Sequence, residues 1–357
     1  MSEFASDKLI EWYQLNKREL PWRDTKDPYL IWISEIILQQ TRVSQGLPYY
    51  HKFVERFPNV KQLANCEEDE VLKYWEGLGY YSRARNLHAA AKQIVNQYNG
   101  LFPNTFNEII KLKGVGRYTA AAIASFAFNE KVPVLDGNVI RVLSRYFSYQ
   151  KDVRKQANQD ELFEIAKEII SRTNPDLYNQ AIMEFGALVC KPQNPECESC
   201  IFNIDCIAKS KSLQNDLPIK SKLNTLKNRY FNYLIFEDNL GKITFRKRVK
   251  KDIWKNMYEF HLIESNNQLL SRNEIEIEIK TILNSEEKFE LILASEIIVQ
   301  KLTHQKINAI FWRVLLKNIS NNFKKEHNFL VLNPEQSVDY AKPLLISNFV
   351  QNTYFKP

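Results

Sequence analysis

Residues 190–206 read CKPQNPECESCIFNIDC and place Cys190, Cys197, Cys200 and Cys206 in the pattern C-x6-C-x2-C-x5-C. The chain has 357 residues but only five cysteines, the fifth being Cys66. Because four of so few cysteines lie together in a segment with two prolines, we expect them to be ligands in a loop folded around a metal ion or cluster. Two disulfides are the alternative, but disulfides are rare in cytosolic proteins and nothing in the sequence indicates export.

The spacing of the four cysteines bears on which metal they bind. Zinc and iron–sulfur clusters both accept four cysteine ligands. Structural zinc sites usually combine two C-x2-C pairs, whereas this stretch contains one. The compact loop therefore favours a 4Fe-4S cluster over zinc, and it leaves open whether the cluster carries electrons or only stabilises the loop.

The composition indicates a globular protein long enough for two domains. Of its residues, 44% are hydrophobic and 25% are charged, which suffices for ordinary cores. No apolar run approaches the roughly 18 residues that span a membrane, and the N-terminus (MSEFASDKLIEW) does not resemble a signal peptide. We therefore expect a cytoplasmic protein. The net charge of +7 weakly favours a polyanionic partner.

The pattern of hydrophobic and polar residues changes along the chain. Residues 1–206 show helical periodicity, as in 87–94 and 162–170. Residues 207–228 are lysine-rich, polar and interrupted by proline, which is typical of an interdomain linker. Residues 229–350 contain alternating runs, and YFNYLIFE, DNLG and KITFRKR read as a β-hairpin. The fold expected is a mainly α N-terminal region followed by a smaller α+β domain.

A glycine-containing turn lies between two helical segments, in LKGVGRYTA (residues 112–120). Gly114 and Gly116 permit a tight turn and a close approach of the backbone to a phosphate. The helix that follows presents free N–H groups at its start, where the helix dipole also favours an anion. An ordinary helix–helix turn is the alternative. We favour phosphate binding by a hairpin at about 109–128.

Two carboxylates stand in apolar surroundings. Glu35 is the only charged residue between Asp27 and Arg42. Burial there would raise its pKa, as a general acid requires near neutral pH, although a carboxylate that reaches solvent or pairs with Arg42 is the alternative. Asp136 follows the apolar run VPVL and precedes a helix, so a simple N-cap is a strong alternative for it. Together, the two suit hydrolysis of a glycosidic bond.

These motifs have a family resemblance in common. SEIILQQT (34–41), GLGYYSRARN (77–86), LKGVGRYTA, VLDGNVIRVL (134–143) and the cysteine loop resemble, in order and spacing, the helix-hairpin-helix DNA glycosylases of the endonuclease III superfamily that carry a 4Fe-4S cluster. The resemblance extends over about residues 8–206 and is strongest to adenine DNA glycosylases of the MutY type. It implies removal of adenine mispaired with 8-oxoguanine or guanine, after the base is flipped out of the duplex.

The resemblance also implies roles for individual residues. Glu35 would protonate the adenine and assist the attacking water, and Asp136, with Asn138 nearby, would stabilise the oxocarbenium ion. Tyr118 would belong to the catalytic pocket. The resemblance assigns the remaining DNA contacts to residues at the orphaned base, at the flipped adenine and in the hairpin: Gln40, Thr41 and Tyr80; Trp22, Arg23 and Gln180; Gly114 and Gly116.

Position 118 separates two reactions within the superfamily. Endonuclease III enzymes carry a lysine in the corresponding hairpin, and its amine attacks the sugar. Tyrosine cannot form a Schiff base, so hydrolysis without strand cleavage is favoured, although Lys113 could give residual lyase activity. Two alternatives remain: a bifunctional pyrimidine glycosylase with lyase activity, and a non-catalytic iron–sulfur DNA-binding protein.

The second domain resembles the C-terminal, Nudix-like domain of the same family, which recognises 8-oxoguanine. VQKLTHQKIN (299–308) matches the family's F-S-H loop in part: Leu302 replaces the aromatic residue, Thr303 replaces the serine and His304 is kept. The sequence shows no acidic helix with the clustered glutamates that bind magnesium, so we expect a lesion-reading domain. The partner implied is double-stranded DNA bound by a monomer, in the cytoplasm at the nucleoid.

Overall fold

The computed structural model describes residues 6–221, 226–283 and 288–355. Contacts between Cα atoms divide the chain into two compact units. The first contains Met1–Cys66 and Arg85–Lys222, and the second contains Glu67–Ala84 and Leu223–Pro357. The described part has no helix that is both long and apolar enough to cross a membrane.

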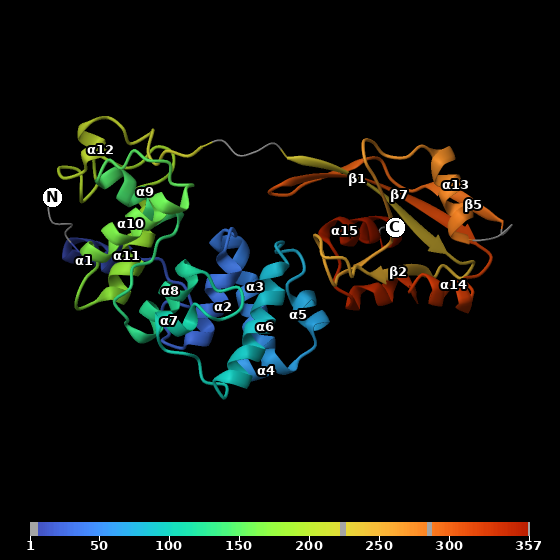
Figure 1. The fold of residues 1–357 in the computed structure, drawn as a ribbon, viewed down its shortest axis with the longest axis horizontal. Helices are drawn as coiled ribbons and strands as arrows, with labels where there is room; N and C mark the ends of the chain where they lie inside the picture. The colour runs from blue at the N-terminus through green and yellow to red at the C-terminus, as the bar shows by residue number, and fades with distance from the viewer. Residues whose placement is uncertain (1–5, 222–225, 284–287, 356–357) are drawn as a thin grey trace. The chain divides into compact units, whose positions relative to one another are not determined.

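The first unit is helical, as the periodicity of the sequence predicts (Figure 1). Its helices are α1 (Ser6–Asn16), α2 (Pro28–Leu38), α3 (Val43–Arg56), α4 (Val60–Asn65), most of α6 (Ser82–Gln97), α7 (Phe106–Ile109), α8 (Arg117–Phe128), α9 (Gly137–Tyr146), α10 (Gln156–Ile169), α11 (Pro175–Leu188) and α12 (Ile207–Ser210).

Helix α2 runs through the interior of this unit. It begins where the Asp27 side chain accepts a hydrogen bond from the backbone N–H of Tyr29, with Pro28 in the first turn. Its residues are apolar on all sides, so it packs against neighbours all round, α3 and α8 among them. Glu35 is the one charged residue of this helix, and its position in the chain therefore places a carboxylate inside the core.

Helices α8, α9 and α11 pack around the same region. Helix α11 contacts α1, α8 and α9. Gly186 of α11 lies against α9: a Cβ atom at this position would lie 2.7 Å from the Cβ of Asn138 and 3.0 Å from its carbonyl oxygen. A larger residue at position 186 would push the two helices apart. Gly186 thus sets the position of the N-terminal end of α9, to which Asp136 and Asn138 belong.

The second unit is built on a mixed sheet with helices. Its central strands, β1 (Lys227–Glu237) and β7 (Gln305–Leu316), run parallel. The order along the sheet is β3-β2-β1-β7-β5, and β4, β6 and β8 pair with β1, β7 and β2, respectively. The other elements are β2 (Ile243–Lys247), β3 (Tyr258–Glu259), β4 (His261–Ser265), β5 (Phe289–Leu293), β6 (Ile298–Lys301), β8 (Leu330–Leu332), α5 (Glu68–Tyr74), α13 (Arg272–Leu283), α14 (Asn321–Glu326), the 3-10 helix η1 (Pro334–Asp339) and α15 (Leu344–Tyr354).

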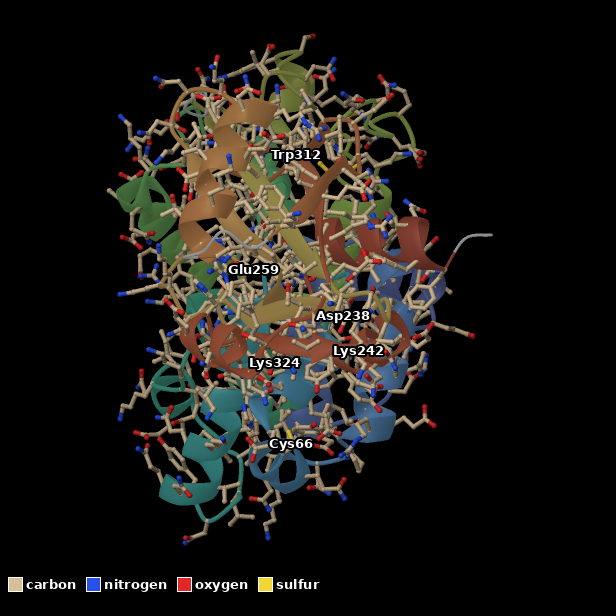
Figure 2. The ribbon with its side chains drawn as sticks, turned by 90° about the vertical axis from the view of Figure 1, so that its right-hand side faces the viewer. Cys66, Asp238, Lys242, Glu259, Trp312 and Lys324 are labelled. Atoms are coloured by element: carbon tan, nitrogen blue, oxygen red, sulfur yellow. The ribbon has the colours of Figure 1, made fainter. Side chains whose placement is uncertain are left out.

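The β-hairpin predicted from the sequence is formed by β1 and β2, which pair antiparallel. The Asp238 side chain accepts hydrogen bonds from the backbone N–H groups of Leu240 and Lys242, at 3.0 and 2.9 Å. Asp238 and Lys242 are labelled in Figure 2. Helix α13 contributes Ile275 and Ile279 to the core that it shares with β1 and β7. The coarse prediction of a helical part followed by a mixed α/β part is therefore confirmed.

Candidate active site

A cavity of about 210 Å³ opens within the first unit. Its lining comes from α2, the connection from α2 to the start of α3, α8, the start of α9, α11 and the segment that follows α1. Eight of the residues predicted from the sequence line it: Trp22, Arg23, Glu35, Thr41, Tyr118, Asp136, Asn138 and Gln180. A cavity of about 150 Å³ is known to hold benzene, so this one is large enough for a bigger planar ring such as a purine.

Glu35 is buried in this cavity and bonded to one side chain. It is 7% exposed, so the alternative of a carboxylate that reaches solvent is wrong. The Tyr118 hydroxyl donates a hydrogen bond of 2.6 Å to its Oε2 atom. Burial raises the pKa of Glu35 to about 7, although the bond from Tyr118 lowers it, and the nearby Asp136 raises it further. Glu35 can therefore carry a proton near neutral pH.

Asp136 is both an N-cap and a residue of the cavity. Its Oδ1 atom accepts hydrogen bonds from the backbone N–H groups of Asn138 (2.8 Å) and Val139 (2.7 Å) at the start of α9. Burial raises the pKa of Asp136, whereas these bonds lower it. Asp136 accepts from three donors, including the Asn138 side chain, and these bonds favour its ionised form, whereas Glu35 accepts from one donor.

Asn138 has its amide orientation fixed by its neighbours. Its Nδ2 atom donates to Asp136 Oδ2 at 2.8 Å, while its Oδ1 atom accepts from Arg141 Nη2 at 2.8 Å. Since a guanidinium only donates, the amide oxygen must face Arg141 and the NH2 group must face Asp136. Arg141 also donates to the carbonyl oxygens of Gly186 (2.7 Å) and Cys190 (2.7 Å), and the sequence analysis did not single it out.

Two further charged residues of the cavity were also missed. Glu184, on α11, accepts bidentate hydrogen bonds from the guanidinium groups of both Arg18 and Arg23. Its position one helical turn after Gln180 was the available signal, because residues four apart lie on the same helix face. Glu184 thus pairs with two guanidinium groups at the cavity wall.

The other predicted base contacts, Trp22 and Gln180, are held by aromatic neighbours. Gln180 Oε1 lies 2.9 Å from the hydroxyl of Tyr13, which donates to it. The Trp22 ring packs edge-on against Tyr50, with 5.1 Å between ring centroids. Both side chains are therefore supported from outside the cavity, which limits their freedom of movement.

The glycine turn has the backbone geometry that the sequence predicts. Gly114 has a φ of +74°, which L side chains rarely adopt. Gly116 is the N-cap of α8, and as a glycine it brings no side-chain cap, so the first N–H groups of α8 remain available to a ligand. The turn can therefore hold an anion with backbone groups alone.

Substitutions at these two glycines should separate folding from DNA binding. In Gly114→Ala, a Cβ would lie 2.4 Å from that of Asn86 and the φ is unfavourable, so we expect a loss of stability of about 1–3 kcal/mol. In Gly116→Ala, the Cβ meets nothing within 4 Å, so only the poorer N-cap of alanine counts and the loss should be smaller, about 0.5–1 kcal/mol. We expect the Gly116→Ala methyl group to weaken duplex binding, measured by fluorescence anisotropy alongside thermal unfolding. Unchanged affinity in Gly116→Ala would contradict phosphate binding by this turn.

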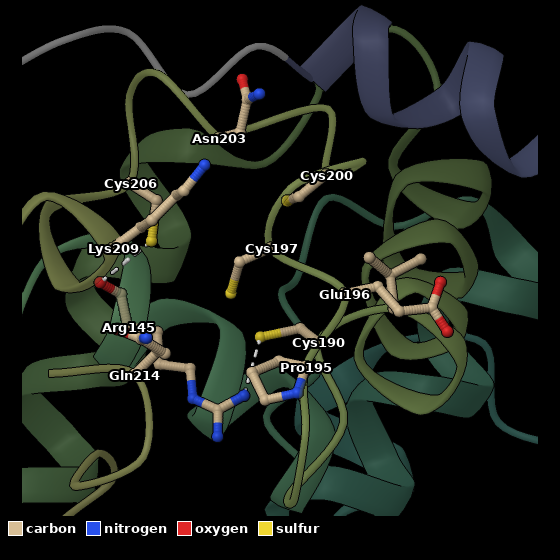
Figure 3. Close-up of a pocket in the computed structure, with 11 residues that line it drawn as sticks. Arg145, Cys190, Pro195, Glu196, Cys197, Cys200, Asn203, Cys206, Lys209 and Gln214 are labelled. Atoms are coloured by element: carbon tan, nitrogen blue, oxygen red, sulfur yellow. Dashed lines mark hydrogen bonds between the residues drawn. The ribbon is translucent and has the colours of Figure 1, made fainter. Parts of the chain in front are cut away.

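The four clustered cysteines surround a second cavity of the first unit. Cys190, Cys197, Cys200 and Cys206 all line it, and Figure 3 shows their side chains around one space. None of the five cysteines forms a disulfide, so the alternative of two disulfides is wrong. In the part of the chain that is described, no group of three or more His, Cys, Asp and Glu side chains is placed to hold a single metal ion.

Arg145 supplies a positive charge beside these cysteines. It is 2% exposed, and its Nη1 atom lies 3.3 Å from Cys190 Sγ. It also donates to the carbonyl oxygens of Lys191 (2.7 Å) and Leu217 (3.1 Å), which ties the start of the loop and the segment after α12 to α9. A buried guanidinium at this place fits a site rich in thiolates, whose negative charge it would offset.

The remaining predicted DNA contacts lie outside both cavities. Gln40 is exposed, with a φ of 55°, just after α2. In the second unit, the hydroxyls of Tyr80 and Thr303 are hydrogen-bonded to each other. Thr303 and His304 are exposed in the turn between β6 and β7. These side chains are therefore accessible from solvent.

Comparison with known proteins identifies the family. The pattern of the family described as "HhH-GPD superfamily base excision DNA repair protein" matches residues 33–170. The adenine DNA glycosylase of Buchnera aphidicola subsp. Acyrthosiphon pisum is 34% identical over 98% of both chains. The adenine DNA glycosylase of Homo sapiens is 39% identical over 60% of this chain and 41% of the human protein.

Solved structures agree with the fold of the helical part. A thermostable thymine-DNA glycosylase superposes with a TM-score of 0.54 at 31% identity, over 58% of this chain and 95% of that protein. An endonuclease III in a non-covalent DNA complex superposes with a TM-score of 0.51 at 22% identity over the same shares, which shows a common fold. The chain belongs to the adenine DNA glycosylase family, within the helix-hairpin-helix superfamily of base excision repair enzymes, and is an N-glycosyl hydrolase.

Proposed function

We propose that this enzyme removes adenine mispaired with 8-oxoguanine or guanine in DNA, by hydrolysis of the N-glycosidic bond and without cutting the strand. The observation that carries the proposal is the pair of buried carboxyl groups, Glu35 and Asp136, in one purine-sized cavity. Membership in the adenine DNA glycosylase family supports adenine as the base. The target nucleotide must leave the duplex to reach such a cavity.

Glu35 supplies the proton that makes adenine a leaving group. The bond from Tyr118 engages Oε2, so Oε1 is the atom that carries the proton toward the base. As the bond between the sugar C1′ and the adenine nitrogen breaks, its electron pair moves onto adenine, which leaves with the proton from Glu35. A water molecule then adds to C1′ and returns a proton to the Glu35 carboxylate. The products are free adenine and an abasic sugar.

Asp136 stabilises the positive charge that develops on the sugar. Its carboxylate is held at the cavity wall by two backbone N–H groups and the Asn138 amide. Because these partners are already in place, the charge needs no rearrangement when the oxocarbenium ion forms.

The absence of an amine nucleophile favours plain hydrolysis. Among the described residues that line the cavity there is no lysine, and the residue bonded to Glu35 is a tyrosine. Tyrosine has no amine with which to form a Schiff base with the sugar. A bifunctional pyrimidine glycosylase is therefore the less favoured alternative.

We further propose that Cys190, Cys197, Cys200 and Cys206 hold a 4Fe-4S cluster. All four line one cavity, and the donor set of four thiols fits this cluster chemically. A cluster of this kind would stabilise the loop between α11 and α12, and no step of the hydrolysis needs it. Iron and zinc analysis with visible absorbance would distinguish the two metals.

The second unit is proposed to read the base opposite adenine. We assign it a Nudix-like fold, with Thr303 and His304 in the recognition turn. Around the orphaned base we assign Tyr80 of this unit, and Gln40 and Thr41 of the first unit. Exposure of the turn supports this assignment. We also propose that the chain divides into a catalytic region (1–206), a linker (207–228) and the recognition domain (229–350). We propose that the enzyme is a monomer and acts on the nucleoid in the cytoplasm.

One assay tests the proposed activity. Purified enzyme is incubated with a duplex that contains one adenine opposite 8-oxoguanine, and each sample is analysed with and without later alkali. We expect strand breakage only after alkali, because an abasic site is stable until alkali cleaves it. Matched duplexes with adenine opposite guanine and adenine opposite thymine should give slower release and no release, respectively.

The other outcomes of this assay decide against the proposal. Breakage without alkali would indicate a lyase, and release of an oxidised pyrimidine instead of adenine would indicate the bifunctional alternative. If the enzyme binds the duplex but no base is released, the non-catalytic alternative holds.

A further inference from the structure

We propose that Glu184 is a positioning residue of the glycosylase reaction: it holds the guanidinium groups of Arg18 and Arg23 at the wall of the cavity and offsets part of their positive charge beside Glu35. The inference rests on the proposed removal of adenine. It adds to that mechanism a residue that does not itself react.

The Glu184 side chain binds two guanidinium groups at once, and we call Glu184 with Arg18 and Arg23 the clamp. The Glu184 side chain is 1% exposed. Its Oε1 atom accepts from Arg18 Nε (2.8 Å), the Arg18 backbone N–H (3.0 Å) and Arg23 Nη1 (3.0 Å). Its Oε2 atom accepts from the Nη2 atoms of Arg18 and Arg23, both at 2.6 Å. Bidentate bonds of this kind fix the plane of each guanidinium.

The clamp leaves donors of Arg23 for a ligand. The side chain of Arg23 is 12% exposed and lines the cavity. Besides Glu184, Arg23 Nη1 donates to the carbonyl oxygen of Arg18 at 2.8 Å, so the bonds described use three of its five N–H groups. The ring nitrogens of adenine are acceptors that such donors recognise. Glu184 thus sets where these N–H groups point, without touching the base.

The clamp also sets the charge near the catalytic acid. Although burial alone raises the pKa of Glu184, the hydrogen bonds from Arg18 and Arg23 outweigh it and lower the pKa to about 2. Glu184 is therefore ionised at neutral pH and cancels one of the two positive charges. Arg23 lowers the pKa of Glu35, so an unopposed Arg23 would lower it further and deprotonate the acid.

The groups that face Glu35 make the sign of this effect predictable. They are Tyr118 on α8, which donates a hydrogen bond, Asp136 at the start of α9, which raises its pKa, and Arg23, which lowers it. The alkaline limb of the pH–rate profile is the range in which the rate of base release falls as pH rises. Loss of the Glu184 charge should move this limb to lower pH. Loss of the Arg23 charge should move the same limb to higher pH. A purely structural role would shift neither.

The experiment compares the full-length enzyme with Glu184→Gln, Glu184→Asp, Arg23→Gln and Glu237→Gln. Glu237→Gln is the matched control, because Glu237 is 8% exposed and accepts bidentate bonds from Arg313 (2.8 and 2.7 Å) in the second unit, outside the cavity. Single-turnover rates of base release from an adenine–8-oxoguanine duplex are measured over a range of pH. Thermal unfolding and duplex affinity are measured in parallel.

We expect Glu184→Gln to release adenine about ten- to a hundredfold more slowly, as misplaced groups do, with its alkaline limb at lower pH. Glu184→Asp should recover part of the rate, Arg23→Gln should shift the limb to higher pH, and Glu237→Gln should match the wild type. If Glu184→Gln does not fold, the other two variants decide the question: Glu184→Asp keeps the charge and should lose rate without a shift of the limb, whereas Arg23→Gln should shift the limb to higher pH.

Two results would overturn the inference: a Glu184→Gln rate equal to that of Glu237→Gln, or a slower rate with no shift of the limb in any variant. A wild-type enzyme that does not release adenine at all would instead refute the proposed function.

Discussion

Glu35→Gln should abolish base release while leaving duplex binding nearly unchanged. Glutamine has the same shape and its amide oxygen can still accept the hydrogen bond from Tyr118, but it has no acidic proton to give. General acid catalysis contributes about 10²- to 10⁴-fold, and we expect a loss of at least this size. Single-turnover base release and equilibrium binding to an adenine–8-oxoguanine duplex measure the two properties.

The pH dependence of the wild type follows from the same carboxyl group. Since burial raises the pKa of Glu35 to about 7, the protonated acid predominates below that pH, and base release should fall as pH rises through it. Folding is linked in the same direction, because the folded state binds this proton more tightly than the unfolded state. Stability relative to Glu35→Gln is thus largest below the unfolded pKa and is lost as pH rises through about 7.

Tyr118→Phe is the companion variant for Glu35. The hydrogen bond from Tyr118 lowers the pKa of Glu35, so its removal should raise that pKa and move the alkaline limb to higher pH. The rate should fall less than in Glu35→Gln, because the acid remains. If Glu35→Gln keeps a rate within tenfold of the wild type, Glu35 is not the acid.

The sequence could predict the cavity because its main residues lie in short, continuous motifs. Glu35 stands alone in an apolar helix, and Asp136 directly precedes another helix, so local pattern was sufficient to select both. For Asp136, the N-cap interpretation and the cavity interpretation turned out to be compatible. The same carboxylate does both because the first turn of α9 faces the cavity.

The partners of residues that act through distant contacts could not be predicted in this way. The partners of Glu184 are Arg18 and Arg23, more than 160 positions away in the chain, and Arg145 bonds a cysteine loop about 45 positions later. No local period encodes such contacts. The parallel pairing of β1 with β7 is a similar case, because the strands are separated by five others in the chain.

Asp136→Asn should lose base release while it keeps the fold of α9. Asparagine caps helices about as well as aspartate, so the backbone N–H groups of Asn138 and Val139 keep an acceptor. The new amide places one NH2 group against that of Asn138, which should cost about 1 kcal/mol of stability. The charge that stabilises the oxocarbenium ion is gone, and we expect base release to fall by about 10²- to 10³-fold.

Asp27→Asn is the matched control for Asp136→Asn, because Asp27 is the N-cap of α2 and accepts from the backbone N–H of Tyr29 at 2.8 Å. It does not line the cavity, so the same loss of charge at a helix start should leave base release unchanged there. Single-turnover rates and thermal unfolding of the two variants separate capping from catalysis. Equal rates in both variants would reduce Asp136 to a helix cap, whereas a large loss confined to Asp136→Asn requires its negative charge beside the reacting sugar.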